Sequence, residues 1–180
     1  MAIDPSKIVV RLLTSDTDVA DFKCGDQDWE REVAAFLQED ALREQSDGLN
    51  KTWVFSHANE CIGYVSLLAS SLRPQADSTI PDVGYPEAPC VMIGQLGVHE
   101  GFQGQGMGET VLYWVIEQAT ESSFGVRFLT LHVDRGNARA QDFYESHDFR
   151  RIRGLSDSAH RFMLLDLHLP GHAPYIDGIT

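Results

Sequence analysis

The strongest constraint in this sequence is a glycine-rich loop between an apolar run and an amphipathic segment. Residues 91–98 are mostly apolar, and residues 103–108 then read Gln-Gly-Gln-Gly-Met-Gly. After the loop, apolar residues recur at helical spacing at Val111, Leu112, Val115, Ile116 and Ala119. Glycine has no Cβ to keep a ligand away from the backbone, and a helix N-terminus presents unpaired N–H groups along a favourable dipole. The pattern predicts a strand, a phosphate-binding turn and a helix, in that order.

Length and composition favour one globular domain. The chain has 180 residues, of which 43% are hydrophobic and 23% are charged. We expect the domain to cover residues 1–169 and an irregular tail to follow over residues 170–180. No apolar run approaches the roughly 18–20 residues that span a bilayer, and the first residues lack a basic segment followed by an apolar one. We therefore expect a cytoplasmic protein that does not associate with membranes.

Charge and cysteine content restrict the possible partners. The formal net charge is −13, which argues against unaided binding to nucleic acid and favours a cationic substrate such as an amine. Cys24, Cys61 and Cys90 have no metal-binding or disulfide spacing, so we expect buried free thiols. His168 and His172 are separated by Pro170 and Gly171 and cannot share a helical face, so we expect no metal site.

The rest of the chain alternates between strands and helices. A helix capped by Asp26 is expected to present an apolar face as far as Leu42, and Asn137 is expected to cap a second helix that ends at Ser146. Residues 73–89 contain four prolines and almost no periodicity, so we expect a long loop that contacts the substrate. The expected strands cover residues 7–13, 52–56, 61–72, 91–98, 126–133, 149–152 and 161–167.

Two common phosphate-binding motifs do not fit the glycine loop. A kinase-type loop ends in Gly-Lys-Ser/Thr, whereas this loop ends in Gly106-Met107-Gly108-Glu109. A dinucleotide fingerprint needs a third glycine, and Glu109 stands at its position. A structural turn without a ligand is the remaining alternative to the pattern Gln-x-x-Gly-x-Gly, which Gln103, Gly106 and Gly108 fit.

This pattern resembles the GNAT superfamily of acyl-CoA-dependent N-acetyltransferases, and the resemblance extends over nearly the whole chain. A second signature supports it: Asn137, Ala140, the Phe143-Tyr144 pair and Phe149 are spaced as in the family's cofactor-side helix. The chain departs from the family in the turn after this helix, where Asp148 replaces the usual glycine and His147 a common apolar residue.

The resemblance implies an α/β (α+β) fold with a mixed sheet of about six to seven strands, flanked by helices, whose splayed central strands hold acetyl-CoA. It implies that main-chain groups of Leu96, Gly97 and Val98 bind the pantetheine arm. It also implies that the pyrophosphate is held by N–H groups from Gln103 through Gly104, Gln105, Gly106 and Met107 to Gly108. Asn137 would add a cofactor contact besides its role as a helix cap.

The implied reaction is direct attack of an amine on the thioester. The resemblance implies that Tyr144 donates a proton to the departing sulfur. From composition alone, Tyr144 would be interpreted as a core tyrosine. An alkylamine is mostly protonated at neutral pH, so a base is needed. His99 and Glu100 are the candidates in the sequence, and a water relay to solvent is the alternative.

A further resemblance concerns the acceptor. Segments 22–25, 63–64 and 93–98 resemble the GNAT branch that contains toxins acetylating aminoacyl-tRNA. Those toxins often carry arginine where this chain has Gln95 and are basic where tRNA docks, unlike this chain. The main hypothesis is acetylation of a primary amine of a small molecule, protein or peptide. The alternatives are a tRNA-acetylating toxin with an antitoxin partner and an acyl-CoA-binding module without turnover. We expect a homodimer.

Overall fold

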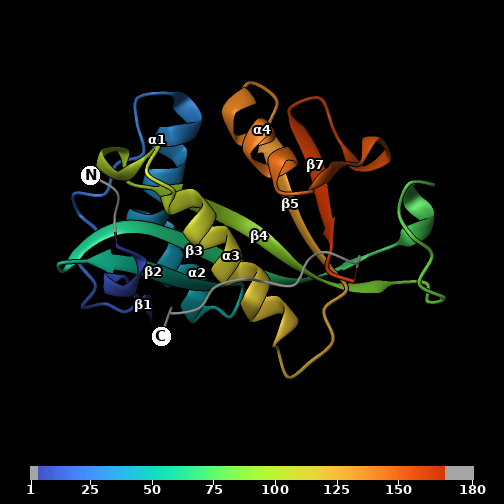
Figure 1. Cartoon of the computed structure of the whole chain (residues 1–180), viewed down its shortest axis with the longest axis horizontal. Coiled ribbons are helices and arrows are strands. Elements are labelled where there is room, and N and C mark those ends of the chain that lie inside the picture. Colours follow the sequence, from blue (N-terminus) through green and yellow to red (C-terminus); the bar gives the residue numbers. More distant parts are fainter. Residues whose placement is uncertain (1–3, 169–180) are drawn as a thin grey trace. The chain divides into compact units, whose positions relative to one another are not determined.

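The computed structural model describes residues 4–168, which form one seven-stranded mixed sheet with helices (Figure 1). The strand order is β1-β2-β3-β4-β5-β7-β6, and it confirms the predicted α+β class and strand number. The strands are β1 Val9–Leu12, β2 Lys51–His57, β3 Glu60–Leu72, β4 Ala88–Val98, β5 Phe128–Asp134, β6 Arg150–Arg151 and β7 His160–Asp166. The α-helices are α1 Asp28–Ala35, α2 Ala41–Ser46, α3 Met107–Thr120 and α4 Ala138–Ser146. The shorter helical turns are η1 Pro5–Lys7, η2 Phe36–Asp40, η3 Pro74–Ala76, η4 Glu100–Phe102 and η5 Arg153–Leu155.

The described chain divides into two compact units. The first contains residues 4–68 and 94–117, and the second contains residues 69–93 and 118–168. The expectation of one domain over residues 1–169 stays a prediction, and the predicted tail over residues 170–180 lies outside the described residues. Within residues 4–168, no helix has the length and apolar character needed to cross a membrane.

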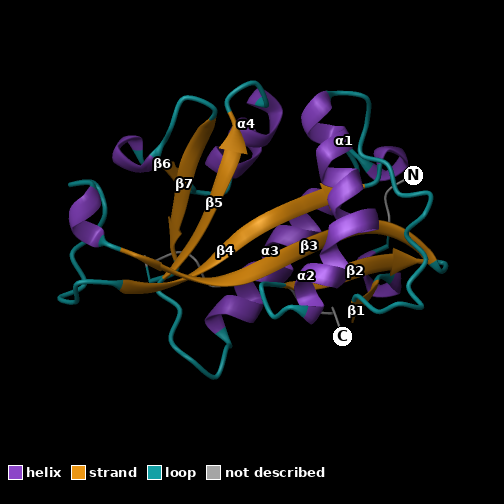
Figure 2. Cartoon of the chain, turned by 180° about the vertical axis from the view of Figure 1, so that it is seen from behind, coloured by secondary structure: helices purple, strands orange, loops and turns teal. Residues whose placement is uncertain are grey.

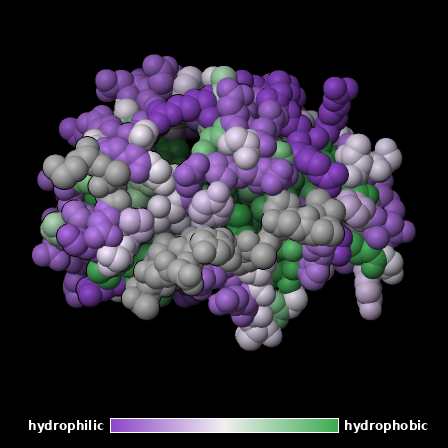
Figure 3. Space-filling model, viewed as in Figure 1, coloured by the Kyte–Doolittle hydropathy of each residue, from purple (hydrophilic) through white to green (hydrophobic). Residues whose placement is uncertain are grey.

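In the first unit, three antiparallel strands lie between two groups of helices. β1 pairs with β2 from Val9↔Ser56 to Leu12↔Trp53, and β2 pairs with β3 as far as His57↔Glu60. Helices α1 and α2 cover one face of β2 and β3, and α3 crosses the other face (Figures 1 and 2). The face of the molecule in Figure 3 is largely hydrophilic, as expected for a charged chain that keeps its apolar side chains in a core.

A π-helical turn interrupts the first long helix. η2 lies between α1 and α2, and the Ala41 N–H donates to the carbonyl of Phe36, five residues back. Such a turn displaces carbonyls from the regular helical ladder, and they need other partners. In α1, just before this turn, the Val33 carbonyl accepts a hydrogen bond from the buried hydroxyl of Tyr64 on β3 at 2.6 Å. The predicted cap Asp26 was wrong: the helix begins at Asp28, and the N–H of its cap Gln27 donates to the Glu30 carboxylate at 3.0 Å.

The ring of Tyr64 also explains a glycine in β4. A Cβ on Gly97 would lie 2.5 Å from Cε1 of Tyr64 and 2.9 Å from Cγ1 of Val33. Phe22 packs edge-on against the same ring, with centroids 5.5 Å apart. Since Tyr64 is held by its hydrogen bond to α1, the ring has little freedom to move away. Gly97 is therefore required by the close approach of β4 to this cluster.

The second unit is built around β5. It pairs in parallel with β4 from Cys90↔Phe128 to Ile93↔Leu131, and antiparallel with β7 from Phe128↔Asp166 to Asp134↔His160. β4 begins at Ala88, earlier than the predicted Val91, because the N–H of Arg127 donates to the Pro89 carbonyl and extends the pairing past a proline. The predicted strand over residues 149–152 is reduced to the two residues of β6.

The segment between β3 and β4 is anchored to the rest of the second unit, to which it belongs. Ile80 is buried in a cluster with Phe128, Phe162 and their neighbours. The Asp77 carboxylate accepts a hydrogen bond from the Gly154 N–H at 2.9 Å, and Arg73 forms an ion pair with Glu87 at 3.2 Å. The predicted loop over residues 73–89 is thus largely irregular in backbone but anchored at several points. Its predicted contact with substrate stays a prediction.

The three cysteines are buried and free, as predicted. Burial raises the pKa of Cys24, Cys61 and Cys90 to about 12. A thiol with such a pKa carries almost no thiolate at neutral pH and is inert toward electrophiles.

The substitution Gly97→Ala tests the close approach of β4 to Tyr64. We expect it to lower the free energy of unfolding by about 1–3 kcal/mol, the usual cost of overpacking a rigid site, as measured by urea denaturation. Gly125→Ala is the matched control, because a Cβ there meets nothing within 4 Å, and it should change stability by less than about 0.5 kcal/mol. Equal stability of the two variants would contradict the packing described for Gly97.

Candidate functional site

The glycine loop presents a row of unpaired backbone donors in the first unit. Among residues 4–168, no group accepts a hydrogen bond from the five N–H groups of Gly104 to Gly108. Gly104 and Gly106 have φ values of +72° and +83°, a left-handed conformation that glycine adopts without strain. The loop leads into α3, whose first turn adds a favourable dipole for an anion. The arrangement suits a phosphate or pyrophosphate.

Gln103 has a different role in the structure. Its N–H donates to the Glu100 carbonyl at 3.4 Å. The row of unpaired donors therefore starts at Gly104, whereas the sequence-based expectation had it start at Gln103. Its side-chain amide donates to the carbonyls of Cys24 at 2.5 Å and Val98 at 3.1 Å. Gln103 therefore fixes the loop to the end of β4 and to the segment before α1.

The two candidate bases of the sequence analysis lie just before the loop. Nδ1 of His99 accepts a hydrogen bond from the Gly101 N–H at 3.2 Å, and its ring packs edge-on against Phe22 and Phe102. The neutral ring therefore carries its proton on Nε2, and its free lone pair is used to cap η4. The Glu100 N–H donates to the Lys23 carbonyl at 2.7 Å, and Glu100 itself is exposed.

The end of β4 supplies main-chain groups next to the loop. β4 pairs with β5 from Cys90 to Ile93 and continues without this pairing to Val98. Leu96 and Val98 are half-buried, and Gly97 is buried. A strand edge that has lost its partner offers N–H and C=O groups to a ligand with amide groups of its own.

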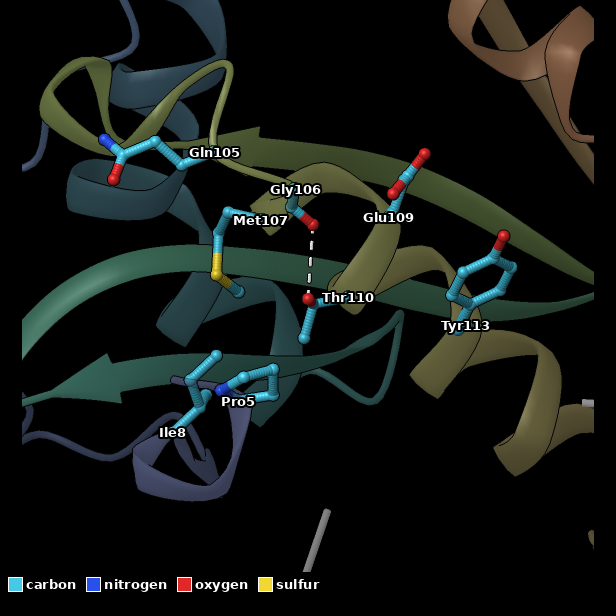
Figure 4. Close-up of a pocket in the computed structure, with 8 residues that line it drawn as sticks. All are labelled: Pro5, Ile8, Gln105, Gly106, Met107, Glu109, Thr110 and Tyr113. Carbon is cyan, nitrogen blue, oxygen red and sulfur yellow. Dashed lines mark hydrogen bonds between the residues drawn. The ribbon is translucent and has the colours of Figure 1, made fainter. Parts of the chain in front are cut away.

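A pocket adjoins the loop on the side of the N-terminal segment (Figure 4). It has a volume of about 200 Å³. Its lining consists of Pro5, Ile8, Gln105, Gly106, Met107, Glu109, Thr110 and Tyr113. The Thr110 hydroxyl donates to the Gly106 carbonyl at 3.2 Å, as the dashed line in Figure 4 shows. Pockets that enclose whole ligands measure about 300–1,000 Å³, so this one suits only part of a ligand.

The remaining predicted site residues belong to the second unit. The Asn137 side chain accepts a hydrogen bond from the Ala140 N–H at 3.0 Å, which confirms its role as the cap of α4. Tyr144 is 7% exposed and packs edge-on against Phe143 and Phe149. Burial raises the pKa of Tyr144, so its hydroxyl stays protonated at neutral pH. Within the described part of the chain, no residue forms a hydrogen bond with this hydroxyl.

The structure also brings together a polar group that the sequence analysis did not single out. The rings of His132 on β5 and His160 on β7 lie edge to face, with centroids 6.3 Å apart. Nδ1 of His160 is 3.4 Å from the Asp157 carboxylate. His132 and His160 are brought together by the pairing of β5 with β7, which no local pattern in the sequence reveals, whereas Asp157 lies only three residues before His160.

The family model for the acetyltransferase (GNAT) family matches residues 13–149. The match covers more than half of the chain, including the glycine loop, α3 and α4. The protein therefore belongs to the GNAT acetyltransferase family.

Several solved structures have a similar fold. A mutant of KacT has 19% sequence identity and a TM-score of 0.73, with 89% of this chain and 95% of that chain covered. AtaTR bound with AcCoA has 20% identity and a TM-score of 0.71, with coverage of 89% and 94%. AtaT complexed with acetyl-methionyl-tRNAfMet has 22% identity and a TM-score of 0.69, with coverage of 86% and 93%. At these identities the likeness concerns the fold alone.

The substitution Gly104→Ala tests the unpaired amides as the phosphate-binding element. A Cβ at this position meets nothing within 4 Å, so the change mainly strains a left-handed residue, at a cost of about 1 kcal/mol, and disturbs the row of donors. We expect calorimetry to show a rise of about tenfold or more in the Kd for CoA.

Gly84→Ala provides the matched control for this experiment. Gly84 has φ +73° and an equally open environment, but it lies in the segment between β3 and β4. Its substitution should produce the same backbone strain and leave the Kd for CoA unchanged. Equal effects of the two variants on CoA binding would show that the loop amides do not hold the cofactor.

Proposed function

We propose that this protein transfers an acetyl group from acetyl-CoA to a primary amine of a small molecule, a peptide or a protein. The observation that carries the proposal is the row of unpartnered N–H groups from Gly104 to Gly108 at the start of the 14-residue helix α3. Membership of the GNAT acetyltransferase family supports it, as does the likeness of the fold to AtaTR, which was solved with AcCoA.

In this proposal the first unit binds the cofactor through its backbone. The amides of Gly104 to Gly108 hold the pyrophosphate, and the main-chain groups of Leu96 to Val98 bind the pantetheine arm. The loop is fixed by Gln103 before the cofactor arrives, so little ordering is needed on binding. Backbone donors aimed at the developing oxyanion lower the barrier by about 3–4 kcal/mol. Asn137 contributes a cofactor contact beside its role as a cap.

The proposed reaction is a direct displacement. The lone pair of a neutral amine attacks the thioester carbon, the carbonyl oxygen takes the negative charge, and the C–S bond then breaks. The departing sulfur takes a proton from the hydroxyl of Tyr144. The new amide nitrogen releases one proton to solvent, and solvent returns a proton to the phenolate of Tyr144. A buried phenol with a raised pKa is protonated at the working pH, which suits this role. Tyrosine-to-phenylalanine mutants of KacT and AtaT are among the similar solved structures.

A base must generate the neutral amine. His99 and Glu100 remain the candidates in the first unit. His99 would have to give up the hydrogen bond from Gly101 before its Nδ1 could accept a proton. Glu100 is exposed to solvent and needs no such rearrangement.

Acetylation of aminoacyl-tRNA is the second candidate function. The fold resembles that of AtaT, which was solved with acetyl-methionyl-tRNAfMet, and AtaT also binds the C-terminus of the antitoxin AtaR. Arg150, Arg151 and Arg153 are exposed on β6 and η5, where phosphate groups can reach them. The net charge of −13 and the neutral side chain of Gln95 favour the first candidate instead. The third candidate function is that of a module that binds acyl-CoA without turnover.

Release of free thiol from acetyl-CoA, measured with a panel of amines at several pH values, tests the proposal. Turnover with a free amine supports the first candidate. Transfer of labelled acetyl to charged tRNA, with no turnover on free amines, favours the second. If CoA binds and no acceptor gives turnover, only the third candidate function, a binding module, remains.

The substitution Tyr144→Phe tests the proton donor. We expect kcat to fall by about 10²-fold, the lower end of general acid catalysis, because a thiolate is already a fair leaving group. The Kd for CoA should stay unchanged, because the phenyl ring keeps the packing. Tyr85→Phe is the control, since Tyr85 is 71% exposed and should be dispensable. A Tyr144→Phe enzyme with full kcat would remove this residue from the mechanism.

A further inference from the structure

The peptide group of Gly101 connects His99 to the glycine loop. Its N–H donates to Nδ1 of His99 at 3.2 Å, and its carbonyl accepts a hydrogen bond from the side-chain amide of Gln105 at 2.8 Å. Gln105 in turn supplies one of the unpaired N–H groups of the loop. Two consecutive hydrogen bonds therefore link the imidazole to the row of unpaired donors, and all three residues belong to the first unit.

The backbone and two aromatic rings hold His99 in place. Its N–H donates to the Ile62 carbonyl on β3 at 3.0 Å, and its carbonyl accepts a hydrogen bond from the Phe102 N–H at 2.8 Å. The half-buried ring packs edge-on against Phe22 and Phe102, with centroids 5.9 Å and 5.8 Å away. Because the ring is held in this way, Nδ1 stays directed at the Gly101 N–H.

The hydrogen bond from Gly101 requires a neutral imidazole. Nδ1 accepts a hydrogen bond only while it carries no proton, and in the imidazolium both ring nitrogens are donors. A proton on Nδ1 would face the proton of the Gly101 N–H, so the bond would be lost and this N–H would have no acceptor. The Gly101 peptide would then no longer be fixed, and neither would the carbonyl that holds the Gln105 side chain.

We propose that neutral His99 is a positioning residue that aligns the loop amides for the pyrophosphate of CoA, and that its protonation weakens CoA binding. The inference rests on the proposed function, in which these amides hold the cofactor. It assigns the lone pair of Nδ1 to the loop instead of to proton transfer. Glu100 or a water relay then generates the neutral amine.

Other charged groups near His99 keep their state between neutral and mildly acid pH. The titratable and charged residues beside its contacts are Asp21, Lys23, Cys24, Cys61, Tyr64 and Glu100. Burial raises the pKa of both thiols and of the Tyr64 phenol, so these three groups stay neutral. The other three are exposed, and carboxylates and ammonium groups in solvent keep their charge above about pH 5. The imidazole is the group of this set that titrates in the range of interest.

The test is the Kd for CoA, measured by calorimetry at about pH 7.5 and about pH 5.5, on either side of the ordinary histidine pKa of about 6.5. The variant His99→Asn keeps an acceptor for the N–H two residues on, as asparagine does at helix caps, but does not titrate. His99→Leu removes the acceptor. The readout for each protein is the ratio of its two Kd values.

Wild type should show a ratio about fivefold to tenfold larger than either variant, since one hydrogen bond is worth about this much in affinity. His99→Asn should bind well at both pH values, and His99→Leu should bind weakly at both. The 3′-phosphate of CoA also takes up a proton near pH 6, but it does so equally with all the proteins. The comparison between proteins therefore reports on His99.

His57→Asn is the matched control, because it removes an imidazole from the β2–β3 hairpin of the same unit. Its ratio should equal that of wild type. Equal ratios for wild type and His99→Asn would overturn the inference and leave the proposed function standing. So would a wild-type affinity that rises in acid relative to the variant, as attraction of an imidazolium for phosphate would produce. Wild-type protein that binds no CoA at either pH would instead remove the proposed function, and this inference with it.

Discussion

The candidate site depends on one side-chain amide. Gln103 donates to two carbonyls from distant parts of the first unit, those of Cys24 and Val98, and so fixes the loop at its first residue. Without this anchor, a loop containing two left-handed glycines would sample many conformations, and its N–H groups would not point in a common direction. With the anchor, the donors from Gly104 to Gly108 are arranged before any ligand binds. The side chain of this residue organises the site, and its neighbours supply the donors.

The same unit shows how packing and hydrogen bonding cooperate around β4. Tyr64 satisfies a carbonyl of the interrupted helix, and its ring approaches β4 so closely that only Gly97 fits. The helix before the π turn is therefore tied to the strand that carries the proposed pantetheine contacts. A change at any of these positions is expected to move the strand edge as well as to lower stability. The close approach thereby links the core of the unit to the geometry of its ligand-binding edge.

Local patterns in the sequence predicted much of this structure. The loop, helix α3 and the cap Asn137 depend on residues within a few positions of one another, and all three were found where expected. Contacts between distant residues were not predictable. One acceptor of the Gln103 amide, the Cys24 carbonyl, lies 79 residues earlier, and the hydroxyl that bonds the Val33 carbonyl of α1 comes from a tyrosine in β3. His132 and His160 become neighbours only through the pairing of β5 with β7. Asp77 is likewise fixed by Gly154, whose position no local pattern reveals.

The buried cysteines have a practical consequence for work on this protein. Because Cys24, Cys61 and Cys90 are all shielded and almost fully protonated, thiol-specific dyes should give negligible background with the folded protein. Fluorophores attached through a newly introduced surface cysteine would then report on a single location. The natural thiols would need no replacement, and their reaction with a dye would mark loss of the native fold.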